Sequence, residues 1–188
     1  MHPRIHELLE YLDEQRRDLR AAFESVRPAL REQVPGPKRW SVANIIEHLA
    51  MVEQRLAGRF SARVAEARAE GVGPETSSDP VLPTFDVSVV QDRASRRTAP
   101  DAVQPTGLHA NAAWRSLEEA TTALRAAILD GDGLALGAVS LRHPVIGAVS
   151  LYHYIAITGA HETRHAGQIR EIAEMFRAAQ HERPEKPF

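Results

Sequence analysis

The chain has 188 residues, with 23 basic and 25 acidic side chains, nine histidines and no cysteine. The lack of cysteine excludes disulfides, thiolate-bound zinc or iron–sulfur sites and a protein thiol nucleophile, so histidines and carboxylates would have to hold any metal. The formal net charge is −2, whereas nucleic-acid binding requires a concentrated positive surface. Nucleic acid is therefore not an expected partner.

Length predicts a single domain over residues 1–188, with a core at about 5–177 and a tail at 180–188. The first residues alternate apolar and charged side chains, unlike the apolar core of a signal peptide. No stretch reaches the ~18–20 apolar residues of a membrane span. We therefore expect a cytoplasmic protein that does not associate with membranes.

Two helices are predicted in the first 71 residues. Apolar residues recur every three or four positions from Ile5 to Phe23, and Pro3 suits a first helical position. A second apolar stripe runs from Val42 and fades near Gly71. Ser41 is its predicted N-cap, but the capping box is expected to be incomplete because Asn44 replaces Glu or Gln.

Residues 71–108 are rich in proline and glycine and predict a long ordered crossover. A third helix follows over about 112–129, and a fourth is predicted from about 146 to 179, introduced by Pro144. No convincing strand pattern is present. The sequence thus predicts an all-α fold, a four-helix bundle whose long crossover leaves helices two and three parallel.

Three histidines are predicted to face the inside of the bundle. His161 and His165 are four residues apart on the last helix, and His48 lies between the apolar residues Ile45 and Val52. Three such imidazoles would hold a metal ion with open positions, as in a catalytic site. The alternative is that each is a core histidine bonded to a neighbouring carbonyl or hydroxyl group.

A competing motif overlaps this pair, because residues 161–165 read His-Glu-Thr-Arg-His, the H-E-x-x-H pattern of zincin peptidases. Glu162 would then be the general base. The extended motif requires Gly and His where this chain has Gln168 and Glu171, and the expected sheet is missing. A peptidase remains the less favoured alternative.

Two longer segments resemble the DinB-like superfamily. Residues 38–53 read KRWSVANIIEHLAMVE, and residues 143–169 read HPVIGAVSLYHYIAITGAHETRHAGQI. They contain a W-S-x-x-x-x-x-E-H-L element and an H-x-x-x-H-x-x-Q-I element, separated by the Pro-rich middle of the chain. The resemblance covers residues 5–177 approximately and implies the same four-helix fold.

The resemblance also implies functional properties. DinB-like proteins take one metal ligand from the first element and two from the last helix, which here are His48, His161 and His165. Zinc or nickel, a homodimer, and a thiol-dependent transferase or a hydrolase acting on a small molecule are implied in the same way. Because the chain has no cysteine, a low-molecular-weight thiol would be a co-substrate. The alternative is a non-catalytic, metal-binding, stress-related module.

Residues near the three histidines are assigned further roles. Gln168 is a candidate to orient a ligand histidine or bind a metal-bound water, and Glu162 is a candidate general base, although a surface or supporting role fits it better. Glu47 and Glu53 are expected to be solvated. Arg93, Arg96 and Arg97 form a small basic cluster in the crossover that is a candidate cover for the mouth of the site. 

Overall fold

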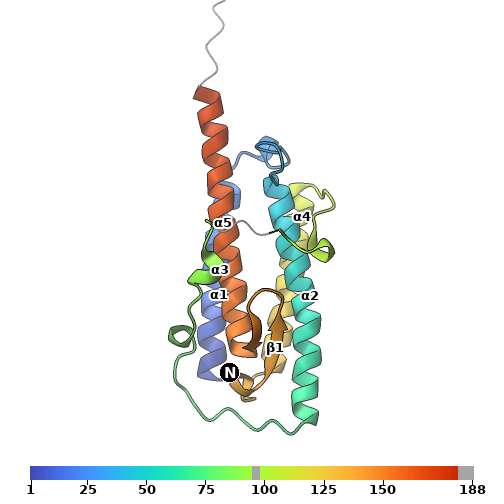
Figure 1. Ribbon diagram of the computed structural model, residues 1–188, viewed down its shortest axis with the longest axis vertical. Coiled ribbons are helices and arrows are strands. Elements are labelled where there is room, and N and C mark those ends of the chain that lie inside the picture. Colours follow the sequence, from blue (N-terminus) through green and yellow to red (C-terminus); the bar gives the residue numbers. More distant parts are fainter. Residues whose placement is uncertain (95–97, 182–188) are drawn as a thin grey trace, which may run out of the picture.

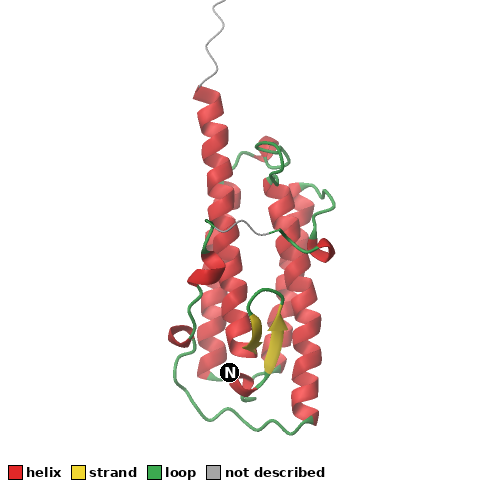
Figure 2. Cartoon of the chain, in the orientation of Figure 1, coloured by secondary structure: helices red, strands yellow, loops and turns green. Residues whose placement is uncertain are grey.

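The computed structural model describes residues 1–94 and 98–181. Its long helices are α1 (Pro3–Glu24), α2 (Val42–Ala69), α4 (Ala110–Asp130) and α5 (Leu151–His181), joined by a short α3 (Ser88–Gln91) and the strands β1 (Ser140–His143) and β2 (Gly147–Ser150) (Figures 1 and 2). The predicted all-α, four-helix architecture is confirmed. The predicted tail lies almost entirely outside the described residues, as do Arg96 and Arg97.

The crossover leaves α2 and α4 parallel, as predicted. Glu47, near the start of α2, binds the amide of Leu108 just before α4, and Arg68, near the end of α2, binds Asp130 at the end of α4. The bundle consists of two helix pairs, α2 on α4 and α1 on α5, and α2 makes few direct contacts with α5. Figure 1 shows the two pairs side by side, with the first part of the crossover running below them from the end of α2 and then rising to α3 beside α5.

The start of α2 corrects one expectation. The Ser41 hydroxyl accepts a hydrogen bond from the Asn44 amide (3.1 Å), and the Asn44 side chain accepts one from the Ser41 amide (3.2 Å). The capping box is therefore complete, because the shorter amide side chain reaches back as Glu or Gln does. This cap fixes the first turns of α2, two turns before His48.

The predicted start of the fourth helix is wrong. Residues 140–150 form an antiparallel hairpin of β1 and β2, and α5 begins only at Leu151. Gly147 takes a positive φ of 92° at the hairpin turn, a conformation that favours glycine. The ring of His143 accepts hydrogen bonds from the amides of Val145 and Ile146 (both 3.2 Å), which satisfies the turn locally. These two features stabilise the hairpin although its strands show only a weak alternation of apolar and polar residues.

A polar layer divides the core into two apolar clusters. One cluster joins the first half of α1 to the second half of α2, and the other joins the remaining halves, with α4 and α5 contributing to both. The layer between them has one residue from each long helix, namely Arg16, Glu53, Thr121 and Glu162. The polar layer therefore fixes the position of each long helix along the bundle axis relative to the other three.

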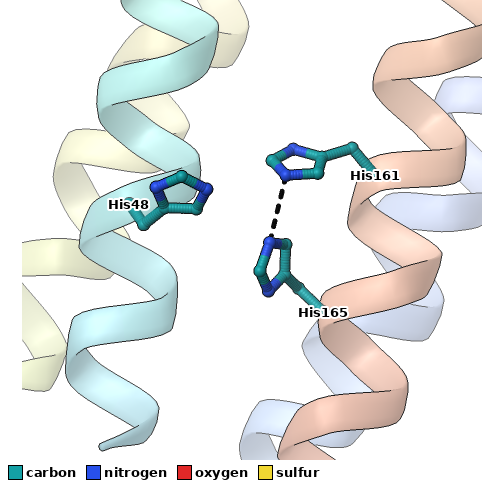
Figure 3. Close-up of side chains that lie close together, drawn as sticks. All are labelled: His48, His161 and His165. Atoms are coloured by element: carbon teal, nitrogen blue, oxygen red, sulfur yellow. Dashed lines mark hydrogen bonds between the residues drawn. The ribbon is translucent and has the colours of Figure 1, made fainter. Parts of the chain in front are cut away.

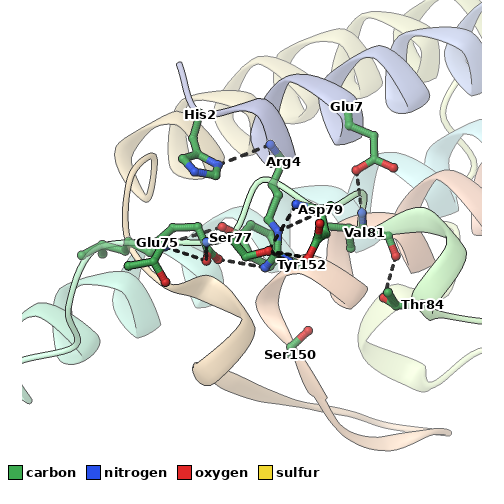
Figure 4. A network of polar contacts seen from close by, with 12 residues as sticks. His2, Arg4, Glu7, Glu75, Ser77, Asp79, Val81, Thr84, Ser150 and Tyr152 are labelled. Atoms are coloured by element: carbon green, nitrogen blue, oxygen red, sulfur yellow. Dashed lines mark hydrogen bonds and ion pairs between the residues drawn. The ribbon is translucent and has the colours of Figure 1, made fainter.

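The beginning of the crossover is tied to α1 by polar contacts (Figure 4). The Arg4 guanidinium donates to the carboxylate of Glu75 (3.0 Å) and to the hydroxyl of Ser77 (2.8 Å). The carboxylate of Glu7 accepts from the amide of Val81 (2.7 Å). These contacts order a segment that has no regular structure of its own.

Among the described residues, no helix is both long and apolar enough to cross a bilayer.

Candidate metal centre

The three histidines predicted as ligands come together between the two helix pairs. His161 and His165 point from α5 toward His48 on α2 (Figure 3). The Nε2 atoms of His161 and His165 are 3.0 Å apart, and the ligand atoms of all three residues lie within 4.8 Å of one another. Two imidazoles on one tetrahedral zinc ion hold their nitrogens roughly 3.3 Å apart. The arrangement fits a metal ion bound by three nitrogens.

Hydrogen bonds orient two of the rings. Nδ1 of His48 lies 2.9 Å from the carbonyl oxygen of Val103, and Nδ1 of His165 lies 3.0 Å from Oε1 of Gln168. Both oxygens are acceptors, so each Nδ1 carries the proton and each Nε2 keeps its lone pair for a metal. The contact expected of Gln168 with a ligand histidine is present. The Val103 contact comes from the crossover and was not anticipated.

The site favours neutral imidazoles. Burial lowers the pKa of His161 to about 3, and the neighbouring charges of His48 and Arg164 act in the same direction. Burial likewise lowers the pKa of His48 and, together with His161 and His48, that of His165. Neutral imidazole is the form that binds a metal ion. A metal ion would also satisfy the two ring nitrogens that face each other at 3.0 Å.

A cavity of about 540 Å³ lies directly beside the histidines. Helix α2, helix α5, the hairpin and residues 98–103 of the crossover form its walls. Trp40 also lines it, with its ring centroid 4.9 Å from that of His48. An ion held by the three histidines would thus face a space large enough for a small molecule, unlike a closed structural site.

Glu162 lies on another face of α5, in the polar layer. Its carboxylate accepts two hydrogen bonds from Arg16 (2.7 and 3.1 Å), and it is not among the cavity residues. Burial and the nearby carboxylate of Glu53 raise the pKa of Glu162 to about 8. The Glu162 carboxylate is directed at α1 rather than at the cavity beside the histidines. This position does not support Glu162 as the general base that the zincin alternative requires.

The expectation that Glu47 and Glu53 are solvated is wrong, since both are almost completely buried. Glu53 accepts from Arg16 and from Thr121 (2.7 and 2.8 Å). The carboxylate of Glu47 accepts from the amides of residues 106–108 and from the Thr106 hydroxyl, which outweighs the effect of burial and lowers the pKa of Glu47. Glu47 therefore anchors the end of the crossover next to His48.

Arg93 is the described member of the basic cluster that was expected to cover the mouth of the site. It forms an ion pair with Glu171 and donates to the Arg164 carbonyl (3.0 Å), so it fastens the crossover to α5. It does not line the cavity. The other two arginines of that cluster lie outside the described residues.

Several cavity residues escaped the sequence analysis. Arg55 and Arg59 lie seven and eleven residues after His48, on the same face of α2, so helical spacing alone could have identified them. His143 and Arg142 come from the hairpin, which the apolar spacing of the sequence did not predict. Their position could not be predicted without that element.

The fold and the site together define a helical bundle in which three histidines from two helices meet beside a cavity and could hold a metal ion. The family model of the DinB superfamily matches residues 11–169, and the chain therefore belongs to the DinB superfamily. It is 28% identical over 152 residues to the uncharacterized protein YuaE of Bacillus subtilis (strain 168), covering 78% of this chain and 85% of that protein. No solved structure is a significant match.

Proposed function

We propose that this protein is a metal-dependent enzyme that acts on a small molecule, with zinc or nickel held by His48, His161 and His165. The observation that carries the proposal is the cavity of about 540 Å³ beside three converging imidazoles. A metal ion bound only for stability is surrounded by protein ligands, whereas a catalytic ion keeps positions open to substrate. Three nitrogen ligands next to a cavity match the second arrangement.

The chain's own residues hold and orient the ligand set. The Val103 carbonyl and Gln168 keep Nε2 of His48 and His165 directed at the centre, and Glu47 holds the crossover beside them. A divalent ion bound there supplies a Lewis acid that makes a weak nucleophile reactive at neutral pH. Because the chain contains no cysteine, a thiol in the reaction would have to be a co-substrate. The reaction classes that fit are thiol-dependent transfer and hydrolysis.

Turnover separates this proposal from a passive metal-binding module. Small electrophiles are incubated with a low-molecular-weight thiol and with the protein loaded with zinc or nickel, and thiol consumption is followed. We expect consumption that is lost in the His165→Ala variant and on metal removal, while the exposed control His109→Ala retains it. Stoichiometric metal binding without consumption of thiol or hydrolysis of any electrophile would identify a passive binder and contradict the proposal.

The location and assembly are proposals on the same family basis. We place the protein in the cytoplasm as a homodimer. Size-exclusion chromatography with light scattering at micromolar protein concentration tests the homodimer, and we expect twice the mass of one chain. A single-chain mass at every concentration would contradict it.

A further inference from the structure

Four arginines line the cavity beside the histidines. Arg55 and Arg59 come from α2, Arg142 from β1 and Arg164 from α5. The cavity also contains His143 and the three candidate ligands, but no aspartate or glutamate lines it among the residues that the structure describes. The cavity therefore concentrates positive charge in a chain whose formal net charge is −2.

The cavity arginines on the α2 and hairpin side are not neutralised by carboxylates. Arg59 donates to two uncharged acceptors, the Tyr154 hydroxyl (3.3 Å) and the Arg142 carbonyl (2.6 Å). Within the described part of the chain, the side chains of Arg55 and Arg142 form neither an ion pair nor a hydrogen bond. By contrast, Arg63 on the same helix pairs with Glu70 (2.9 Å). Three guanidinium groups thus remain available to a ligand.

The rest of the lining is mostly apolar. Helices α2 and α5 contribute Leu56 and Ile157, the crossover contributes Val90, and the hairpin contributes Val145. Arg55 lies two helical turns from His48, which is about 10 Å along the axis of α2. A ligand that reaches from the histidines to the exposed arginines must therefore have an apolar body between its reacting end and its charged end.

We infer that the cavity selects an organic anion: a small molecule with an apolar body whose carboxylate or phosphate group is bound by Arg55, Arg59 and Arg142, while its other end faces the histidines. Guanidinium groups suit both anions because their donors match paired oxygens. This inference names the substrate class of the proposed metal-dependent enzyme and rests on that function. It also explains why these three exposed arginines line the cavity without a carboxylate partner among the described residues.

Matched ligands test the inference on the full, metal-loaded chain. Octanoate, octyl phosphate, octan-1-ol and octylammonium share one apolar body and differ in charge. Their dissociation constants are measured by NMR titration, in which shifts of the Tyr154 and Thr158 amides locate binding in the cavity. We expect octanoate or octyl phosphate to bind at least about tenfold more tightly than octan-1-ol, as one charge-assisted hydrogen bond provides. The tighter of the two anions identifies the head group.

Variants determine whether the arginines cause this preference. The triple variant Arg55→Gln/Arg59→Gln/Arg142→Gln should reduce the preference to less than about threefold, since a net hydrogen bond to a charged group is worth about tenfold or more. Arg63→Gln, which removes the same charge from α2 outside the cavity, should leave it unchanged. Equal binding of anion and alcohol would overturn the inference. An anion preference that survives the triple variant would overturn it as well, because groups other than these three arginines would then bind the anion.

Metal content is measured on the same samples. Protein that fails to bind metal contradicts the proposed function, even where an arginine-dependent anion preference persists and supports the inference. Metal-loaded protein without anion preference contradicts the inference and leaves the proposed function standing. 

Discussion

Arg16 is the centre of the polar layer, and its loss should destabilise the bundle measurably. Its guanidinium donates three hydrogen bonds, two to Glu162 (2.7 and 3.1 Å) and one to Glu53 (2.7 Å). The two carboxylate side chains are only 3% and 2% exposed. The substitution Arg16→Met keeps most of the apolar stem and leaves the carboxylates without their counterion.

Removing one member of a buried ion pair costs about 3–5 kcal/mol of unfolding free energy. Two features favour the lower end of that range. Glu53 keeps the hydrogen bond from Thr121 (2.8 Å), and the pKa of Glu162, raised to about 8 by burial and by Glu53, lets that group take up a proton. We therefore expect a loss of about 3 kcal/mol, which for a chain of this size lowers Tm by roughly 6–12 °C.

Urea unfolding followed by circular dichroism measures this loss, with Arg17→Met as the matched control. Arg17 is the next residue on α1 and is exposed, so its substitution should change stability by no more than about 0.5 kcal/mol. Adding Glu53→Gln to Arg16→Met should recover part of the loss, because the cost comes from the unpaired charge. A stability of Arg16→Met within about 1 kcal/mol of the control would refute the assigned role of the layer.

Three further predictions concern the crossover and the helix contacts. Glu47→Ala removes the acceptor for four hydrogen bonds beside the site, and should weaken metal affinity about tenfold or more in a chelator competition; unchanged affinity would show that this anchor does not support the site. Gly159→Ala places a methyl group against the ring of Tyr11 and should cost about 1–3 kcal/mol in urea unfolding, whereas a neutral result would mean that the Tyr11 ring moves aside without cost. The pKa of Glu75 is lowered because hydrogen bonds from Ser77 and Tyr152, together with the charge of Arg4, outweigh burial. Ionised Glu75 therefore stabilises the fold at pH values above its unfolded pKa, and this stabilisation is lost as the pH falls through its folded pKa. The difference in unfolding free energy between the wild type and Glu75→Gln should decrease from pH 7 to pH 3. A difference that stays constant would contradict this linkage.

The sequence predicted the helices and the histidines because both depend on local periodicity. Apolar residues at three- and four-residue spacing located all four long helices, and the same spacing brought His161 and His165 to one face. The long Pro-rich link also predicted the parallel arrangement of α2 and α4. Each of these inferences needs only distances along the chain.

The polar layer was missed, although the sequence contains a signal for it. Arg16 interrupts the apolar stripe of α1 between Leu12 and Leu19, and Glu53 interrupts that of α2 between Leu49 and Leu56. A charge on an otherwise buried face requires a partner, so these positions could have been matched to each other. The expectation that Glu53 is solvated left no place for this pairing.

Other features depend on tertiary contacts that no spacing reveals. The capture of residues 106–108 by Glu47 and the bond from His48 to the Val103 carbonyl join segments more than fifty residues apart. The hairpin before α5 depends on a turn conformation at Gly147 and on the ring of His143. Since the hairpin and the crossover form two walls of the cavity, its size and charge could be known only from the structure.

Metal stoichiometry tests the central claim most directly. Protein purified without an affinity tag is dialysed against zinc or nickel, and its metal content is measured by mass spectrometry, alongside the single substitutions His48→Ala, His161→Ala and His165→Ala and the exposed control His109→Ala. The three-histidine site predicts one ion per chain in the wild type and in the control, and a strong loss in each of the three site variants. A wild-type content far below one ion per chain, or full occupancy in the site variants, would contradict the site.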